Sequence, residues 1–137
     1  MPQEEMQDHV CKTLKAQMLK SGHVLMCLWP LEAPVPLKRA WCLFELWMAL
    51  QNGVKVTMCF GGADGAALYD AVRDGSFDIA KLVGEIRAQD AGCMEQKDKD
   101  MILSLIENEM GVERFNAELQ QKLHKCLQDT VRSVIAR

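Results

Sequence analysis

The stretch that decides the fold runs Ala40-Trp41-Cys42-Leu43-Phe44-Glu45-Leu46-Trp47-Met48-Ala49-Leu50. It is typical of a helix that is apolar on almost every side, and Glu45 is its only charged residue. Burying a carboxylate alone is very costly, so Glu45 must be solvated at an edge, paired, or used in chemistry. Which of these three applies decides whether the chain is an enzyme or a scaffold.

Two short apolar runs flank this helix, which we expect to span residues 37–51. Residues 23–29 form a continuous apolar run between Gly22 and Pro30, which predicts a strand buried on both faces and hence a parallel sheet. Residues 54–60 are rich in β-branched side chains and predict a second strand. The helix between them would then be a parallel crossover connection.

The rest of the chain is mostly helical in pattern. Apolar residues spaced by three or four predict helices over 4–20, 66–73, 94–110 and 112–135. Residues 76–93 fit either a helix or a turn followed by a strand at 82–88, and we favour the strand. The sequence therefore predicts an α/β fold with a small parallel sheet of about three strands flanked by helices, followed by two C-terminal helices over 94–135.

Length and composition point to one soluble globular domain over residues 1–137. A net charge of −3, with both signs interspersed, gives no electrostatic footprint for nucleic acid or for an anionic membrane surface. No apolar run reaches the roughly 20 residues of a membrane helix. The N-terminal residues 1–5 are polar and acidic, without a basic region followed by an apolar one, so we expect no signal peptide. The six cysteines form no CxxC pair, so we expect reduced thiols and a cytoplasmic protein.

Glu45 lies near Lys38 and Asn52 on a helical wheel, at about 100° per residue. The three residues would form a thin polar stripe, which is usually a solvent edge. The alternative is functional: the helix follows the carboxyl end of a buried strand, where open α/β sheets bind ligands. Trp29 and Trp41 could line such a crevice, with Glu45 contacting a ribose hydroxyl or a cation.

Few other residues carry chemistry. Arg39 at the helix start either is solvated, which we favour, or binds an anion or pairs within the chain. The three histidines are isolated from cysteines and carboxylates at ligand spacing, so we predict no metal site. Nothing in the sequence places a histidine near Cys42, so we predict that Cys42 is a core thiol rather than a nucleophile.

Residues 36–46, Pro36-Leu37-Lys38-Arg39-Ala40-Trp41-Cys42-Leu43-Phe44-Glu45-Leu46, resemble the S-x-W-C-L-x-E-L stretch of TIR (Toll/interleukin-1 receptor) domains. The likeness is closest to TIR-like regions of multidomain algal and protist proteins with kinesin-light-chain-like or tetratricopeptide repeats. It extends to a later helix at Asp98–Ile106, Gly111 and the pair Phe115-Asn116. The resemblance implies a flavodoxin-like fold. It also implies a catalytic role for Glu45, which matches the catalytic glutamate of the NAD-cleaving members.

The chain departs from the TIR pattern in two ways. Arg39 stands where a serine is usual, and the first strand and first crossover have no counterpart. We therefore expect a domain truncated at its N-terminus, either a fragment or part of an assembly that completes the sheet.

The expected function is an intracellular signalling or protein-interaction module, which binds itself or other domains of a larger parent protein. The first alternative is an NAD hydrolase, with Glu45 catalytic, Trp29, Arg39 and Trp41 binding the ligand, and NAD as substrate rather than cofactor. The second alternative is an inactive structural fragment. Neither nucleic acid nor membrane is an expected partner.

Overall fold

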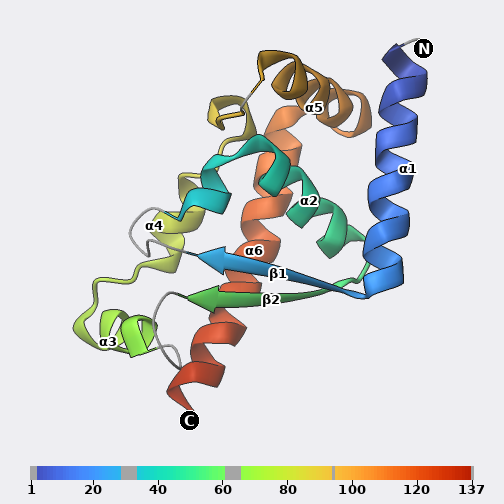
Figure 1. Ribbon diagram of the computed structural model, residues 1–137. Helices are drawn as coiled ribbons and strands as arrows, with labels where there is room; N and C mark the ends of the chain where they lie inside the picture. Colours follow the sequence, from blue (N-terminus) through green and yellow to red (C-terminus); the bar gives the residue numbers. More distant parts are fainter. Residues whose placement is uncertain (1–2, 29–33, 61–65, 94, 137) are drawn as a thin grey trace.

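The computed structural model describes residues 3–28, 34–60, 66–93 and 95–136. The chain is mixed α/β and mostly helical, with a small parallel sheet (Figure 1). Its elements are α1 (Gln3–Ser21), β1 (His23–Leu28), the 3-10 helix η1 (Val35–Lys38), α2 (Ala40–Gln51), β2 (Lys55–Phe60), α3 (Ala66–Asp74), α4 (Ile79–Gly84), the 3-10 helix η3 (Ala88–Asp90), α5 (Gln96–Glu109) and α6 (Val112–Ile135). The two flanking strands, and the helices expected near both ends of the chain, are confirmed to within a few residues.

β1 and β2 pair in parallel, in a register that places His23 opposite Lys55 and Cys27 opposite Cys59. α2 connects them, as expected for a parallel crossover. Figure 1 shows the two strands side by side and pointing the same way. The parallel pairing and the crossover predicted from the sequence are therefore confirmed.

The expectation of a third strand at 82–88 is wrong. In the described part of the chain the sheet has two strands, and residues 79–84 form the short helix α4. The Asp78 carboxylate caps this helix by accepting a hydrogen bond from the Lys81 backbone N–H at 3.1 Å. Residues 88–90 then form η3, and Gly92 makes an isolated parallel bridge with Arg39. The sheet is therefore smaller than the three strands that the sequence predicts.

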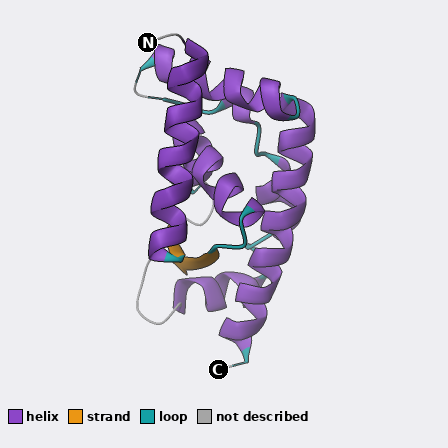
Figure 2. Ribbon diagram, turned by 90° about the vertical axis from the view of Figure 1, so that its right-hand side faces the viewer, coloured by secondary structure: helices purple, strands orange, loops and turns teal. Residues whose placement is uncertain are grey.

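α2 lies at the centre of the molecule. It contacts α1, β2, α5, η1 and η3. Figures 1 and 2 together place it between the sheet and the long helix α6. Six of its twelve residues are buried, and they are Ala40, Leu43, Phe44, Leu46, Met48 and Ala49. A helix that is apolar on nearly every side is buried, because exposing any one of its faces to water would cost free energy.

The sheet has one covered and one open face. Met26 and Leu28 of β1 and Met58 of β2 are buried in the core. The alternate residues of β1 are exposed, with Leu25 at 67% exposure. The expectation that β1 is buried on both faces is therefore wrong for one face. We call this surface the open face, and its residues are His23, Leu25, Cys27, Lys55, Thr57 and Cys59.

Two helix ends depend on glycine. Gly22 has a φ of 67° and donates its N–H to the Met18 carbonyl at 2.8 Å, so it ends α1. Gly111 has a φ of 86° and donates its N–H to the Ile106 carbonyl at 3.0 Å. It ends α5 and lets the chain change direction before α6 begins. None of the described helices is long and apolar enough to cross a membrane.

Candidate functional site

The start of α2 is held by a distant segment of the chain. The Gly92 N–H donates to the Lys38 carbonyl at 2.7 Å, and the Ala40 N–H donates to the Gly92 carbonyl at 2.9 Å. Arg39 lies between these bonds in an extended conformation, with φ −115° and ψ 129°, and its side chain is exposed. The backbone of residues 38–40 is thus fixed, while the Arg39 guanidinium points to a solvated position.

The polar stripe predicted from the helical wheel does not form as one helix face. Lys38 belongs to η1, and the extended residue Arg39 separates it from α2. Asn52 caps the other end, where its side-chain amide donates to the Met48 carbonyl at 2.7 Å. Glu45 is therefore the only member of the predicted stripe that lies within the helix itself.

Glu45 and Trp41 lie one turn apart on α2, and both are half-buried. Among the described residues, Glu45 has no hydrogen-bond or ion-pair partner. Burial raises the pKa of the Glu45 carboxyl above its ordinary value, because desolvation disfavours the charged form. The Glu45 carboxylate is therefore neither paired nor fully solvated: it is partly desolvated and has no partner among the described residues.

Cys42 lies within electrostatic reach of Glu45 and Arg39. Burial is the main cause that raises the pKa of the Cys42 thiol, the Glu45 carboxylate raises it further, and Arg39 opposes both. A raised pKa leaves less of the nucleophilic thiolate at neutral pH. The structure thus gives Cys42 the environment of a structural thiol.

The candidate ligand-binding residues are only partly brought together. Trp41 and Glu45 lie on the first turns of α2, and Arg39 directly precedes the helix. Trp29 lies outside the described residues, so its place beside them remains a prediction. A groove of about 980 Å³ runs between α4 and α6, and a pocket of about 220 Å³ lies between α1, α2 and α5. Neither cavity is lined by the three placed candidates.

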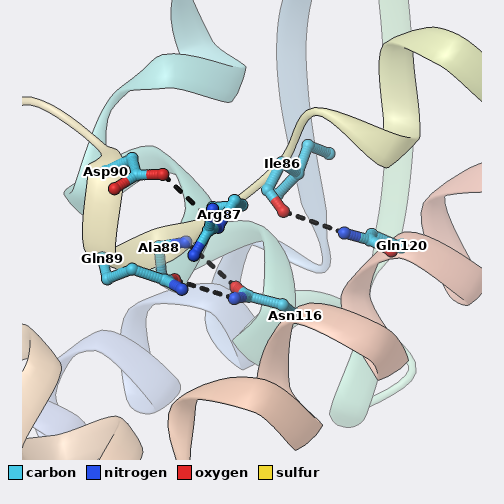
Figure 3. A network of polar contacts seen from close by, with 7 residues as sticks. All are labelled: Ile86, Arg87, Ala88, Gln89, Asp90, Asn116 and Gln120. Carbon is cyan, nitrogen blue, oxygen red and sulfur yellow. Dashed lines mark hydrogen bonds and ion pairs between the residues drawn. The ribbon is translucent and has the colours of Figure 1, made fainter.

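The sequence reasoning missed a polar network on α6 (Figure 3). Asn116 is buried, accepts a hydrogen bond from the Ala88 backbone N–H at 3.0 Å, and donates to the Gln89 side chain at 2.8 Å. One turn later, Gln120 donates to the Ile86 carbonyl at 2.9 Å. The signal was an asparagine within the apolar periodicity of α6, which a buried position tolerates only when it is hydrogen-bonded.

The described residues contain no group of three or more histidine, cysteine, aspartate or glutamate side chains that could hold a metal ion. Comparisons of the chain with protein families, with curated proteins and with solved structures found no match. The assignment of function therefore depends on the geometry of the chain itself.

We expect Glu45→Gln to raise the free energy of unfolding at neutral pH by roughly 0.5 kcal/mol or less, because the side chain is half exposed and solvent screens the effect. The folded-state pKa of Glu45 is raised from 4.5. The stability that this carboxyl contributes is therefore present below that value and is lost as the pH rises through the folded pKa. Glutamine cannot ionise, so the variant escapes this loss.

Urea unfolding of wild type and variant at about pH 4 and pH 7 measures the effect. The two proteins should differ less at the lower pH. Glu85→Gln is the matched control, because Glu85 is exposed. A loss of stability in Glu45→Gln at pH 7 would instead show that a partner holds the carboxylate.

Proposed function

We propose that the chain is a TIR-like protein-interaction module that self-associates through the open face of its sheet. The observation that carries the proposal is the 67% exposure of Leu25 in the middle of a parallel strand. Parallel sheets in proteins almost always have both faces covered, and a two-stranded sheet is marginal without further packing. A partner that covers the open face would remove both anomalies.

The chemistry of the open face favours a second copy of the chain as the partner. Leu25 lies opposite Thr57, between the pairs His23–Lys55 and Cys27–Cys59. His23 is engaged within the face, where its Nε2 lies 2.6 Å from the Thr57 hydroxyl. Lys55 is its only lysine, and the face has no carboxylate, so it offers no charge pattern that would select an acidic or basic partner. A surface of this kind is compatible with an isologous dimer, in which the same patch contributes from both copies.

Leu25→Asp tests this association. If a second copy covers the open face, the new carboxylate at its centre must lose its water without gaining a partner. We expect the wild-type chain to associate in a concentration-dependent way in sedimentation velocity, and the variant to dissociate at least about tenfold more readily, which corresponds to about 1.4 kcal/mol. Leucine burial alone is worth at least about 1.5 kcal/mol.

Tyr69→Asp is the matched control, since Tyr69 is 41% exposed and lies on α3 rather than on either strand of the open face. It should leave the association unchanged. Equal weakening by both variants would place the contact elsewhere. A wild-type chain that stays monomeric at all concentrations would refute self-association.

The second candidate function is NAD cleavage by Glu45. It is favoured by a partly desolvated carboxylate one turn from the half-buried Trp41, because carboxyl groups with perturbed pKa values gather at functional sites. The test is the release of nicotinamide from NAD by the full chain. Release that Glu45→Gln abolishes and Glu85→Gln retains would support it, and the absence of release would exclude it.

A further inference from the structure

We propose that Cys27 and Cys59 form a dithiol–disulfide pair, which low-molecular-weight disulfides oxidise to a covalent link between β1 and β2. The proposal concerns a modification site on the open face. It does not rest on the proposed function, because it needs only the two neighbouring strands.

The strand register is the first observation. Cys27 lies directly opposite Cys59. Neighbouring strands are about 4.8 Å apart, which falls within the roughly 4.4–6.8 Å that separates the Cα atoms of a disulfide. Residues paired across a sheet also point to the same face. The backbone therefore holds the two cysteines on the same side of the sheet, at a Cα separation that a disulfide can span.

The two thiols lie close enough to influence each other's ionisation. The Cys59 thiol donates a weak hydrogen bond to the Met26 carbonyl, with Sγ and O 3.5 Å apart. Desolvation raises the pKa of Cys59 above its ordinary value, and a hydrogen bond with the Cys27 thiol raises it further. The pair is free and reduced in the structure. Two thiols on directly paired residues of neighbouring strands need little movement to form a bond.

The two cysteines differ in access, which gives them different roles. Cys27 is exposed, whereas Cys59 is partly covered. The entering disulfide therefore meets Cys27 first, and Cys59 is placed to resolve the product. Cys42 and Cys126 are half-buried, and burial is the main cause that raises the pKa of each thiol. Within the described strands, the register aligns no other two cysteines.

The reaction is a pair of thiol–disulfide exchanges. The Cys27 thiol loses its proton to water, and the thiolate attacks one sulfur of glutathione disulfide. The S–S bond of the reagent breaks, and the first glutathione leaves as a thiolate that takes up a proton. The Cys59 thiol then loses its proton to water, and its thiolate attacks the Cys27 sulfur. The mixed-disulfide S–S bond breaks, and the second glutathione leaves as a thiolate that takes up a proton. Two protein thiols lose two electrons, one glutathione disulfide gains them, and no proton is consumed overall.

The experiment treats the reduced, folded full chain with glutathione disulfide, blocks free thiols with N-ethylmaleimide, and maps tryptic peptides by mass spectrometry. Cleavage after lysine and arginine places Cys27 alone in peptide 21–38, Cys59 alone in peptide 56–73 and Cys42 alone in peptide 40–55. We expect a product roughly 2 Da lighter than the reduced chain, with peptides 21–38 and 56–73 linked. Dilute protein is used, so that self-association does not cover the open face.

Three variants and one condition decide the result. Cys59→Ser should stop at a mixed disulfide between Cys27 and glutathione, Cys27→Ser should give no link to peptide 56–73, and Cys42→Ser should react as wild type. Unfolding in guanidinium chloride should scatter the pairing over other cysteines. A dominant link other than Cys27–Cys59 in the folded chain, or a stable mixed disulfide at Cys27 in wild type, would overturn the proposal.

Discussion

Phe115→Ala is expected to lower the free energy of unfolding by about 3–5 kcal/mol, because it removes a large, fully buried aromatic side chain. Phe115 is fully buried, and its ring lies 5.6 Å from the ring of Trp47. Trp47 stacks on Phe44 at 6.2 Å, and Phe44 meets Trp41 edge to face at 6.5 Å. Phe115 is thus the contact through which α6 joins the aromatic residues of α2, and its removal leaves a cavity between the two helices.

Urea unfolding followed by tryptophan fluorescence measures this loss, because Trp47 reports directly on the contact. Phe115→Leu keeps most of the volume and should cost less than about 1.5 kcal/mol. Glu113→Ala, at an exposed position of the same helix, should change stability by no more than about 0.5 kcal/mol. A cost below about 1 kcal/mol for Phe115→Ala would show that α6 does not dock on α2 in solution.

The predictable parts of the fold are those in which local pattern and tertiary environment agree. The apolar spacing of residues 112–135 is that of a long amphipathic helix, and α6 has those bounds. The apolar runs around residues 23–28 and 55–60 became the paired strands. The open face was not foreseeable in the same way, because a continuous apolar strand looks identical whether one or both faces are covered.

The error at residues 82–88 has a local cause. Ile79, Leu82 and Val83 follow helical spacing as well as they follow an apolar run, so periodicity alone could not choose between the two. The deciding signal was Asp78, whose carboxylate caps the first turn of α4. An aspartate before an apolar segment of this spacing favours a helix start over a strand.

The sequence predicts which residues of the candidate site lie on α2, but it does not predict how those residues are arranged. Glu45 and Trp41 were expected on one helix and lie there. The stripe with Lys38 failed because one extended residue, Arg39, shifts the start of α2, and a helical wheel cannot register such a break. The anchoring of that break by Gly92, more than fifty residues further along the chain, is a long-range contact that sequence spacing does not encode.

Asn116→Ala is expected to lower the free energy of unfolding by about 2–3 kcal/mol, because it leaves a buried donor unpaired. Asn116 is 8% exposed, and its oxygen is the acceptor for the Ala88 N–H, which is itself buried. No water can replace that oxygen cheaply at a buried backbone amide. Asn108→Ala is the matched control, since Asn108 is an exposed asparagine within α5, and we expect a change of no more than about 0.5 kcal/mol.

A double-mutant cycle with Gln89→Ala separates the two hydrogen bonds of Asn116. The side-chain bond to Gln89 should account for about 0.5–1.5 kcal/mol of coupling energy. The rest of the loss in unfolding free energy then comes from the Ala88 N–H, which is left without an acceptor. The second part should be the larger, because Gln89 is only partly covered and can turn to water, whereas the backbone amide of η3 cannot. If Asn116→Ala costs no more than Asn108→Ala, residues 86–90 do not dock on α6. The Gly92 contact that fixes the start of α2, and with it the position of Glu45, would then lose the support of this neighbouring segment.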